Sequence, residues 1–331
     1  MYGFFKQFIF RFNPEKAHHI TFALLRFARK IGLMPLFKVS GGKPTEFVGL
    51  NFKNRVGIAA GLDKNADYLH ELAALGFGHV EIGTITPKPQ DGNPQPRLFR
   101  LVEDTAIINR MGFNNKGLSH AVNQLKKRPK NVIVGGNIGK NKVTPNNEAV
   151  NDYLICHREL YPHVDYFTIN VSSPNTPGLR ELQDKKPLQE ILHALSEQRN
   201  TFDQHKKHFL KVAPDLSEGQ INDIAELVKE GFVDGLIISN TTIDRGGLNT
   251  PEKEVEAIGA GGLSGLPVLE KSNQVLKQFR ALLPSTPIIG VGGICNREGA
   301  LSKFEAGADM IQVYSGFIFK GPQLLKETIN L

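Results

Sequence analysis

The sequence lacks the features that mark disulfide-linked, metal-binding and Rossmann-type proteins. Its only two cysteines, Cys156 and Cys295, have no C-x-x-C spacing, which argues against a disulfide framework or a zinc site and fits a reducing cytosol. No cluster of His, Cys, Asp and Glu has metal-ligand spacing, so we expect no metal. No G-x-G-x-x-G opens a helix after the first predicted strand, which counts against a Rossmann fold.

Long apolar runs are also missing. No stretch approaches the roughly 20 apolar residues of a membrane-spanning helix, and no small-residue cleavage site follows the charged N-terminal segment, so we expect neither a spanning helix nor a signal peptide. The 331 residues are 40% hydrophobic and 22% charged, which is typical of a soluble globular protein with a large core.

Positive charge is concentrated at the N-terminus. Residues 1–38 hold seven Lys and Arg against one acid, Glu15; seven minus one leaves +6 of the formal net charge of +7, so the rest of the chain is nearly neutral. The same segment contains eight of the 21 phenylalanines. The body therefore carries no basic stripe of the kind that nucleic-acid binding requires, and we expect no nucleic-acid partner.

The N-terminal segment has the pattern of two amphipathic helices. The first is predicted from apolar residues at helical spacing between Phe4 and Phe12, and the second follows the Asn13-Pro14 start signal. The second is expected to place five residues on one apolar face: Ala17, Ile20, Leu24, Ala28 and Ile31. Such helices suit an anionic membrane surface, so residues 1–40 are predicted to form a membrane segment; packing on the body of the protein is the alternative.

After a Gly-Gly-Lys-Pro linker at 41–44, the body alternates apolar runs with helical patterns. Strands are expected at 56–59, 79–83, 132–135, 166–169, 208–212, 235–238, 288–291 and 310–314. Helices are expected between most of them, as at 68–75, 188–200, 218–230, 269–283 and 297–306. Eight such units in one run predict an α/β fold, a (β/α)8 TIM barrel over residues 41–331, with the segment 1–40 as an extension.

Polar groups and glycines follow the predicted strands. The stiff loop Asn170-Val-Ser-Ser-Pro-Asn175 comes directly after a buried run, although a plain turn capping the next helix is an alternative. Gly292-Gly293 and Ser315-Gly316 follow the last two strands, where a barrel of this type binds phosphate. We therefore expect an active-site mouth and a phosphorylated ligand at this end of the barrel.

Seven motifs taken together carry a family resemblance: AAGLDKN, NRMGFNN, NVSSPNTPGLR, ISNTT, GGLSG, GVGGI and YSGFIFKGP. With them the whole chain resembles the dihydroorotate dehydrogenases, specifically their membrane-associated, quinone-dependent class 2 branch. The resemblance implies an FMN-bearing barrel, with one FMN per chain. It implies oxidation of dihydroorotate to orotate in pyrimidine biosynthesis, with hydride passing to FMN and electrons to a membrane quinone.

The resemblance also assigns roles to residues. Ser173 matches the catalytic base, a position where the cytosolic branch has Cys, and Thr176 is a candidate for the proton exit. The positions matching FMN contacts are Ala59, Ala60, Gly61, Leu62, Asp63, Lys64, Thr84, Asn137, Asn170, Lys211, Ser239, Gly262, Gly293, Tyr314 and Ser315. The positions matching substrate contacts are Lys64, Asn109, Arg110, Met111, Gly112, Phe113, Asn170, Asn175, Asn240 and Thr241. His19 and Arg100 are the polar groups expected near the quinone head, at an apolar tunnel formed by the N-terminal helices.

Within this reading the protein is a monomer bound through residues 1–38 to the cytoplasmic face of a bacterial inner membrane. Two alternatives stay open. One is another FMN barrel oxidoreductase acting on a pyrimidine, either fumarate- or NAD-linked or of the dihydrouridine type, which the N-terminal extension and Ser173 disfavour. The other is a non-catalytic peripheral membrane protein, which the intact polar groups after the strands disfavour.

Overall fold

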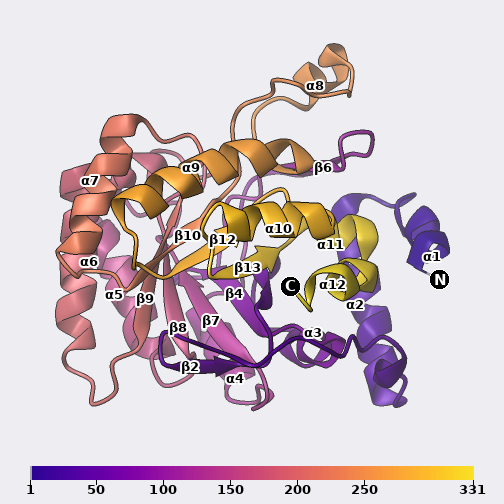
Figure 1. Ribbon diagram of the computed structural model, residues 1–331, viewed down its shortest axis with the longest axis horizontal. Helices are drawn as coiled ribbons and strands as arrows, with labels where there is room; N and C mark the ends of the chain where they lie inside the picture. Colours follow the sequence, from indigo (N-terminus) through magenta and orange to yellow (C-terminus); the bar gives the residue numbers. More distant parts are fainter. Residues whose placement is uncertain (1) are drawn as a thin grey trace.

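Eight parallel strands close into a barrel that forms the centre of the molecule (Figure 1). The computed structural model describes residues 2–331, so residue 1 of the predicted membrane segment lies outside it. The barrel strands are β3 (Val56–Asp63), β4 (His79–Ile85), β7 (Ile133–Ile138), β8 (Tyr166–Asn170), β9 (Lys207–Val212), β10 (Gly235–Ile238), β12 (Ile288–Val291) and β13 (Met310–Val313). All eight expected strands are therefore confirmed, and with them the TIM-barrel architecture.

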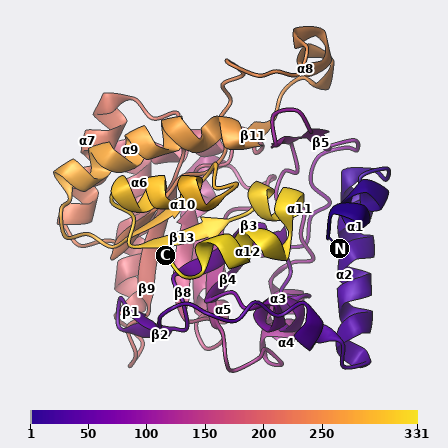
Figure 2. The ribbon, with the colours of Figure 1, turned by 45° about the vertical axis from the view of Figure 1, so that its right-hand side comes forward.

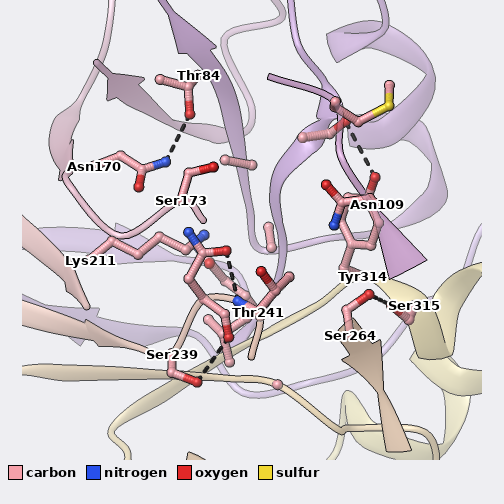
Figure 3. Close-up of a pocket in the computed structure, with 18 of the residues that line it drawn as sticks. Thr84, Asn109, Asn170, Ser173, Lys211, Ser239, Thr241, Ser264, Tyr314 and Ser315 are labelled. Carbon is pink, nitrogen blue, oxygen red and sulfur yellow. Dashed lines mark hydrogen bonds between the residues drawn. The ribbon is translucent and has the colours of Figure 1, made fainter. Parts of the chain in front are cut away.

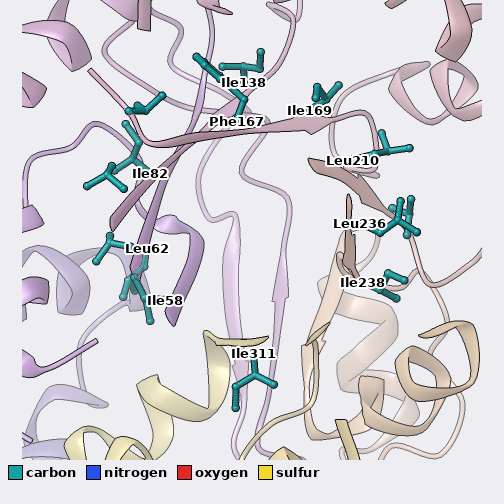
Figure 4. Close-up of a cluster of buried hydrophobic side chains, with 14 of the residues drawn as sticks. Ile58, Leu62, Ile82, Ile138, Phe167, Ile169, Leu210, Leu236, Ile238 and Ile311 are labelled. Carbon is teal, nitrogen blue, oxygen red and sulfur yellow. The ribbon is translucent and has the colours of Figure 1, made fainter. Parts of the chain in front are cut away.

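Helices surround the barrel and bury its outer surface. Those that follow barrel strands are α3 (Leu69–Leu75), α4 (Leu118–Leu125), α5 (Ala149–Leu160), α6 (Lys185–Arg199), α7 (Glu218–Lys229), α9 (Leu269–Leu282), α10 (Arg297–Glu305), α11 (Ser315–Lys320) and α12 (Pro322–Thr328). Along each strand, alternate residues such as Ile58, Ile82 and Ile169 point outward and form one apolar cluster beneath the helices (Figure 4). This alternation fixes which strand residues face the barrel interior.

The amino-terminal end of the barrel is closed by a hairpin that the sequence analysis did not predict. Its strands, β1 (Thr45–Phe47) and β2 (Leu50–Phe52), pair antiparallel. Phe47 stacks on Phe209 inside the barrel, with ring centroids 5.9 Å apart. This apolar plug leaves only the opposite end of the barrel for polar chemistry.

A second addition lies over that opposite end. Three short strands, β5 (Leu98–Leu101), β6 (Ala106–Asn109) and β11 (Gly262–Gly265), form an antiparallel sheet in the order β11-β6-β5. The helix α8 (Glu252–Ile258) projects above this sheet (Figure 1) and contributes Val255 to its small apolar cluster. The segments that follow two barrel strands therefore meet over the mouth of the barrel.

The two predicted N-terminal helices are present as α1 (Tyr2–Ile9) and α2 (Pro14–Lys30), and α2 runs along the side of the barrel (Figure 2). The Asn13 side chain caps α2 by accepting from the N–H of Glu15. One detail of the prediction is wrong. Leu24 and Ile31 are about half exposed and do not share the buried face of Ala17 and Ala28.

The contact face of α2 is set by Phe22, which is not among the five residues predicted for the apolar face. Its ring stacks on Tyr68 at 4.0 Å between centroids and joins the main core. An ion pair between Arg97 and Glu15, 2.6 Å long with both side chains largely buried, fixes the start of the helix. One side of α2 is thus bound to the body, while Leu24, Phe27 and Ile31 remain exposed.

Acid should destabilise the fold because of a buried histidine. His79 is fully buried on β4, neither ring nitrogen has a hydrogen-bond partner within residues 2–331, and burial lowers its pKa to about 3. Between pH 6.5 and pH 3 the unfolded chain, with a His pKa of about 6.5, binds a proton at His79, whereas the folded chain does not. This contribution to stability is complete above pH 6.5 and is lost as pH falls toward 3. At pH 5 we expect a loss of about 2 kcal/mol from this residue alone.

Urea unfolding curves at pH 7.5 and pH 5 measure the effect. The control is His79→Leu, which removes the titrating group while keeping an apolar side chain of similar size. The other buried histidines still contribute in that variant, so its acid loss should be smaller than that of the wild type without vanishing. An unchanged pH dependence in the variant would contradict the assignment.

Candidate active site

A cavity opens at the carboxyl ends of the barrel strands, beneath the β11-β6-β5 sheet (Figure 3). Its empty space, counted out to the open mouth, is about 1070 Å³. Polar side chains from six barrel strands and the loops that follow them converge in it, together with Asn109 of β6 and Ser264 of β11. This is the usual arrangement of a barrel active site.

Most residues predicted from the sequence line this cavity. The lining includes Ala59, Ala60, Gly61, Lys64, Thr84, Asn109, Met111, Gly112, Phe113, Asn170, Ser173, Asn175, Lys211, Ser239, Asn240, Thr241, Gly293, Tyr314 and Ser315. Eight predicted residues do not line it: His19, Leu62, Asp63, Arg100, Arg110, Asn137, Thr176 and Gly262. The expected glycine turn contributes Gly292 as well as Gly293, and the wall also has members that were not predicted, among them Ser264 and Gln312.

The residues off the wall have other contacts. Leu62 packs in the main core, and the fully buried carboxylate of Asp63 accepts from the N–H groups of Asp67 and Tyr68 at 2.8 Å, which shapes the turn after β3. The Arg110 guanidinium lies over the Phe99 ring and donates to the carbonyls of residues 258 and 260. It therefore ties the β6 end to the α8 segment, whereas its neighbours Met111, Gly112 and Phe113 face the cavity.

The loop after β8 places Ser173 on the cavity wall. Its hydroxyl oxygen accepts from the N–H of Asn175 at 3.2 Å, and the residue is 6% exposed. Arg180 holds the loop from behind by donating to the carbonyls of Ser172 and Thr241. The Thr176 hydroxyl, in the same loop, is buried and has no hydrogen-bond partner within residues 2–331. The loop thus presents one oriented hydroxyl and one unpaired hydroxyl.

The Asn170 amide organises the wall beside Ser173. It donates to Thr84 Oγ1 at 2.9 Å and Asn137 Oδ1 at 3.1 Å, and its oxygen accepts from the N–H and the hydroxyl of Ser172. Thr84 in turn donates to Asn137 at 2.6 Å. Asn137 is fully buried behind this row, which explains why it does not line the cavity.

Three further amides and one hydroxyl surround the same space. Asn175 donates to Asn109 at 3.0 Å, Asn109 donates to the Gly262 carbonyl at 3.2 Å, and Asn240 donates to the Ser172 hydroxyl at 2.9 Å. The Thr241 hydroxyl is buried without a partner in the described chain. Gly262 contributes its carbonyl to this row from just outside the cavity. Fixed amides of this kind can bind a ring that carries both N–H and C=O groups.

Lys211 brings a cation to the floor of the cavity. It is 5% exposed, and its Nζ lies 3.8 Å from a carboxylate oxygen of Glu81, which is fully buried inside the barrel. Glu81 also accepts from Asn137 and Gln312, each at 2.8 Å. Glu81 is not among the predicted site residues, although a charged residue inside the apolar run 79–83 is a sequence signal for it.

Glycines and serines make the opposite wall. Gly292 and Gly293 follow β12 with φ of +108° and +80°, which side chains rarely tolerate, and the Gly293 N–H has no acceptor within residues 2–331. On the same wall the Ser315 hydroxyl donates a hydrogen bond to the Ser264 hydroxyl at 2.9 Å. Free N–H groups and hydroxyls fit the phosphate of a nucleotide-like cofactor.

The N-terminal segment reaches the edge of this site. Lys64, on the wall, donates to the Gly61 carbonyl at 2.8 Å, and burial lowers its pKa to about 8 while Glu15 of α2 opposes that shift. His18 faces the body on the same side, and burial lowers its pKa to about 3. His19 is exposed instead, and Arg100 donates to the carbonyls of Phe10 and Phe12. The side chain of Arg100, a residue of β5, therefore contacts the segment between α1 and α2.

Comparison with known proteins places the chain among named relatives. A family model described as dihydroorotate dehydrogenase matches residues 44–330. A Christiangramia forsetii protein named dihydroorotate dehydrogenase (quinone) is 50% identical over 326 residues, which cover 96% of this chain and 94% of that protein. A Neisseria meningitidis serogroup C protein of the same name is 49% identical over 337 residues, covering 100% and 99%.

The chain is also similar to solved structures of dihydroorotate dehydrogenases. The chain is similar to the crystal structure described as DHODH in complex with ferulenol from Eimeria tenella, with a TM-score of 0.87 and 35% sequence identity. The match covers 95% of this chain and 89% of that one. A ligand-free structure of the same Eimeria tenella protein matches with a TM-score of 0.85 over 93% of this chain.

Proposed function

The chain belongs to the dihydroorotate dehydrogenase family, and from this premise we propose that it oxidises dihydroorotate to orotate in pyrimidine biosynthesis, using FMN and a membrane quinone. The observation that carries the proposal is the convergence of Ser173, Lys211 and four cavity amides on one cavity with a glycine-rich wall. The quinone as final acceptor is supported by the names of the relatives that match the whole length of this chain.

The cavity fits FMN in two places. The turn at Gly292–Gly293, with Ser264 and Ser315, suits the phosphate, and Lys211 supplies a fixed cation for negative charge on the flavin ring. When bound, FMN supplies the acceptor for the hydride and the route of the electrons to the quinone. The ion pair with the buried carboxylate of Glu81 keeps the Lys211 ammonium in place on the cavity floor and away from solvent.

Ser173 acts as the base that takes the C5 proton of dihydroorotate. A hydroxyl is a weak base in water, so it needs orientation and an exit for its own proton. The N–H of Asn175 orients the oxygen by donating to it, which leaves the Ser173 O–H free to donate elsewhere. The unpaired hydroxyl of Thr176, three residues on, is suited to receive that proton.

The substrate ring is held by amides, and its carboxylate by a lysine. Asn109, Asn175 and Asn240 offer donors and acceptors to the pyrimidine, and the buried Thr241 hydroxyl gains a partner when substrate binds. Lys64, together with the loop Met111–Phe113, suits the carboxylate. Asn170 acts indirectly, since its own hydrogen bonds to Thr84, Asn137 and Ser172 already occupy its amide.

The N-terminal segment is the membrane contact and the quinone entrance, with residues 1–40 acting apart from the catalytic barrel 41–331. Seven large apolar side chains of this segment are more than 40% exposed: Phe4, Phe8, Leu24, Phe27, Ile31, Leu33 and Leu36. Lysines and arginines lie between them along the sequence, as in helices that rest on anionic lipid. No helix in residues 2–331 has the length and apolarity to cross a membrane. Arg100 lies at the inner side of α1 and α2, near the expected quinone head, and His19 at the exposed side.

Removing residues 1–38 should separate the two parts of the activity. Every barrel strand and every residue lining the cavity lies after residue 55, so the truncated protein should fold, bind FMN and reduce it with dihydroorotate. It should lose sedimentation with anionic vesicles and most of its quinone reduction. A matched variant, Phe27→Ser with Leu36→Ser, alters only exposed residues and should lose vesicle binding alone. Unchanged sedimentation of the truncated protein would contradict the membrane assignment.

The decisive experiment for the whole proposal is an anaerobic titration. The purified protein should show a flavin absorption band that bleaches when dihydroorotate is added and returns when a quinone is added. A band that ignores dihydroorotate would keep the cofactor and remove the substrate. Absence of flavin binding, even after reconstitution with FMN, would overturn the proposal.

A further inference from the structure

Lys303 on α10 is a buried cation without an acidic partner. The residue is fully buried, and no Asp or Glu within residues 2–331 lies at ion-pair distance from it. Its Nζ donates to the hydroxyl of Ser272 on α9 at 2.6 Å. Burial lowers its pKa to about 7, and the more distant Glu270 opposes that shift. An ammonium held in the interior with one neutral partner is costly, so an anion bound nearby would stabilise the charged form of Lys303.

The stem of Lys303 runs beneath β12 toward the cavity wall. It lies over Gly290, where a Cβ would come within 3.3 Å of the lysine Cδ. Ser272, which receives the ammonium, donates to the Val291 carbonyl at 2.7 Å. The same Ser272 hydroxyl lies 3.2 Å from the point where a Cβ on Gly292 would be. The ammonium therefore lies directly behind the Gly292–Gly293 turn of the site.

We propose that Lys303, acting through Ser272, is a positioning residue for the phosphate of the bound flavin nucleotide. The ammonium stands behind the glycine turn that lines the cavity, and a phosphate bound on the other side of that turn would supply a negative charge close to it. The Lys303–Ser272–Val291 chain also fixes the end of β12 to α9 and α10, so the turn keeps its shape before the ligand arrives. This inference rests on the proposed use of FMN.

Electrostatics gives the size and the selectivity of the effect. A unit charge several ångströms from an anion, at an effective dielectric constant of about 20, corresponds to about tenfold or more in affinity. Only a ligand that carries the phosphate can gain from it. Riboflavin, which has the same ring and ribityl chain without the phosphate, serves as the matched ligand.

The test compares the two ligands on the full-length apoprotein by quenching of flavin fluorescence. In Lys303→Met, which keeps the length of the side chain and removes its charge, FMN affinity should fall about tenfold or more while riboflavin affinity is unchanged. Lys303→Arg, which keeps the charge, should retain most of the preference for FMN over riboflavin. Lys277→Met, an exposed change on α9, controls for net charge and should bind both ligands as the wild type does.

The outcomes separate the two proposals. An equal loss for FMN and riboflavin in Lys303→Met would assign Lys303 to general packing, and an unchanged FMN affinity would remove any role; either result overturns the inference. Should Lys303→Met fail to fold, Ser272→Ala tests the same chain, with the same selective loss expected and the same outcomes against it. A wild-type protein that binds neither ligand would instead defeat the proposed function.

Discussion

Dihydroorotate oxidation by Ser173→Ala should be about 10²- to 10⁴-fold slower than by the wild type, the range that a positioned base contributes. The hydroxyl is the group on the Asn170–Asn175 loop that lines the cavity with its oxygen oriented by a backbone N–H. Its loss removes the proton acceptor but disturbs little else, because Asn170, Ser172 and Arg180 hold the loop through other groups. The variant should therefore keep its flavin spectrum and its affinity for orotate.

Stopped-flow reduction of the bound flavin measures this step apart from quinone turnover. Ser173→Cys is the informative companion, since a thiol, with an ordinary pKa of about 8.5, ionises near neutral pH to a thiolate that can accept the proton, whereas a hydroxyl does not ionise there. Ser173→Cys should recover part of the rate of flavin reduction, and this rate should increase with pH as the thiolate forms. Wild-type rates in Ser173→Ala would contradict the base assignment, and lost flavin binding would assign the residue to the cofactor.

Lys211→Met should slow flavin reduction about 100-fold, the effect of removing one preorganised group at a developing charge. The ammonium is a cation on the cavity floor. In the proposed reaction, negative charge develops on the flavin ring, and a fixed cation stabilises it. Without it the reduction potential of the bound flavin should fall. The buried carboxylate of Glu81 keeps its bonds from Asn137 and Gln312, so the barrel should still fold.

A spectroelectrochemical titration gives the potential, and stopped flow gives the rate. Lys207→Met is the matched control, because it lies on the same strand but is partly exposed and paired with Asp234 at 3.1 Å. It should leave both quantities unchanged. A wild-type potential in Lys211→Met would show that the lysine is too far from the ring to affect its charge.

The barrel was predictable from sequence because each of its strands is a short apolar run bounded by turn residues. Two of them, 235–238 and 288–291, begin and end where predicted, and β3 extends to Asp63 beyond its predicted end at residue 59. The strands outside the barrel were harder to predict from the sequence. The β5, β6 and β11 strands have four residues each, and β11 (Gly-Leu-Ser-Gly) resembles a loop because its pairing with β6 is visible only in three dimensions.

The site was predictable where a motif places a side chain at a strand end, as with Ser173 and Asn240. The site was less predictable where the orientation of a side chain decides whether it faces the cavity. Arg110 belongs to a motif whose next three residues face the cavity, yet its guanidinium turns to the α8 segment because two carbonyls and the Phe99 ring receive it there. Glu81 lies inside a strand, and only closure of the barrel brings it to Lys211, which is 130 positions later in the chain.

The helical period of α2 predicted the wrong face for a similar reason. Leu24 and Ile31 follow the apolar spacing of Ala17 and Ala28, but the helix is oriented by two contacts that periodicity does not contain. These are the stack of Phe22 on Tyr68 and the ion pair of Glu15 with Arg97. An amphipathic pattern indicates that a helix has an apolar side, whereas its partner decides which residues that side includes.

The carboxylate of Glu81 also limits how this enzyme can diverge. It gathers groups from four other strands: Asn137 of β7, Tyr166 of β8, Lys211 of β9 and Gln312 of β13. Replacing Glu81 by a residue without a carboxylate leaves several buried donors without an acceptor at once. Each unsatisfied donor costs about 1–3 kcal/mol. A replacement of Glu81 that keeps the fold must therefore be accompanied by changes at several of these residues, which lie far apart in the sequence.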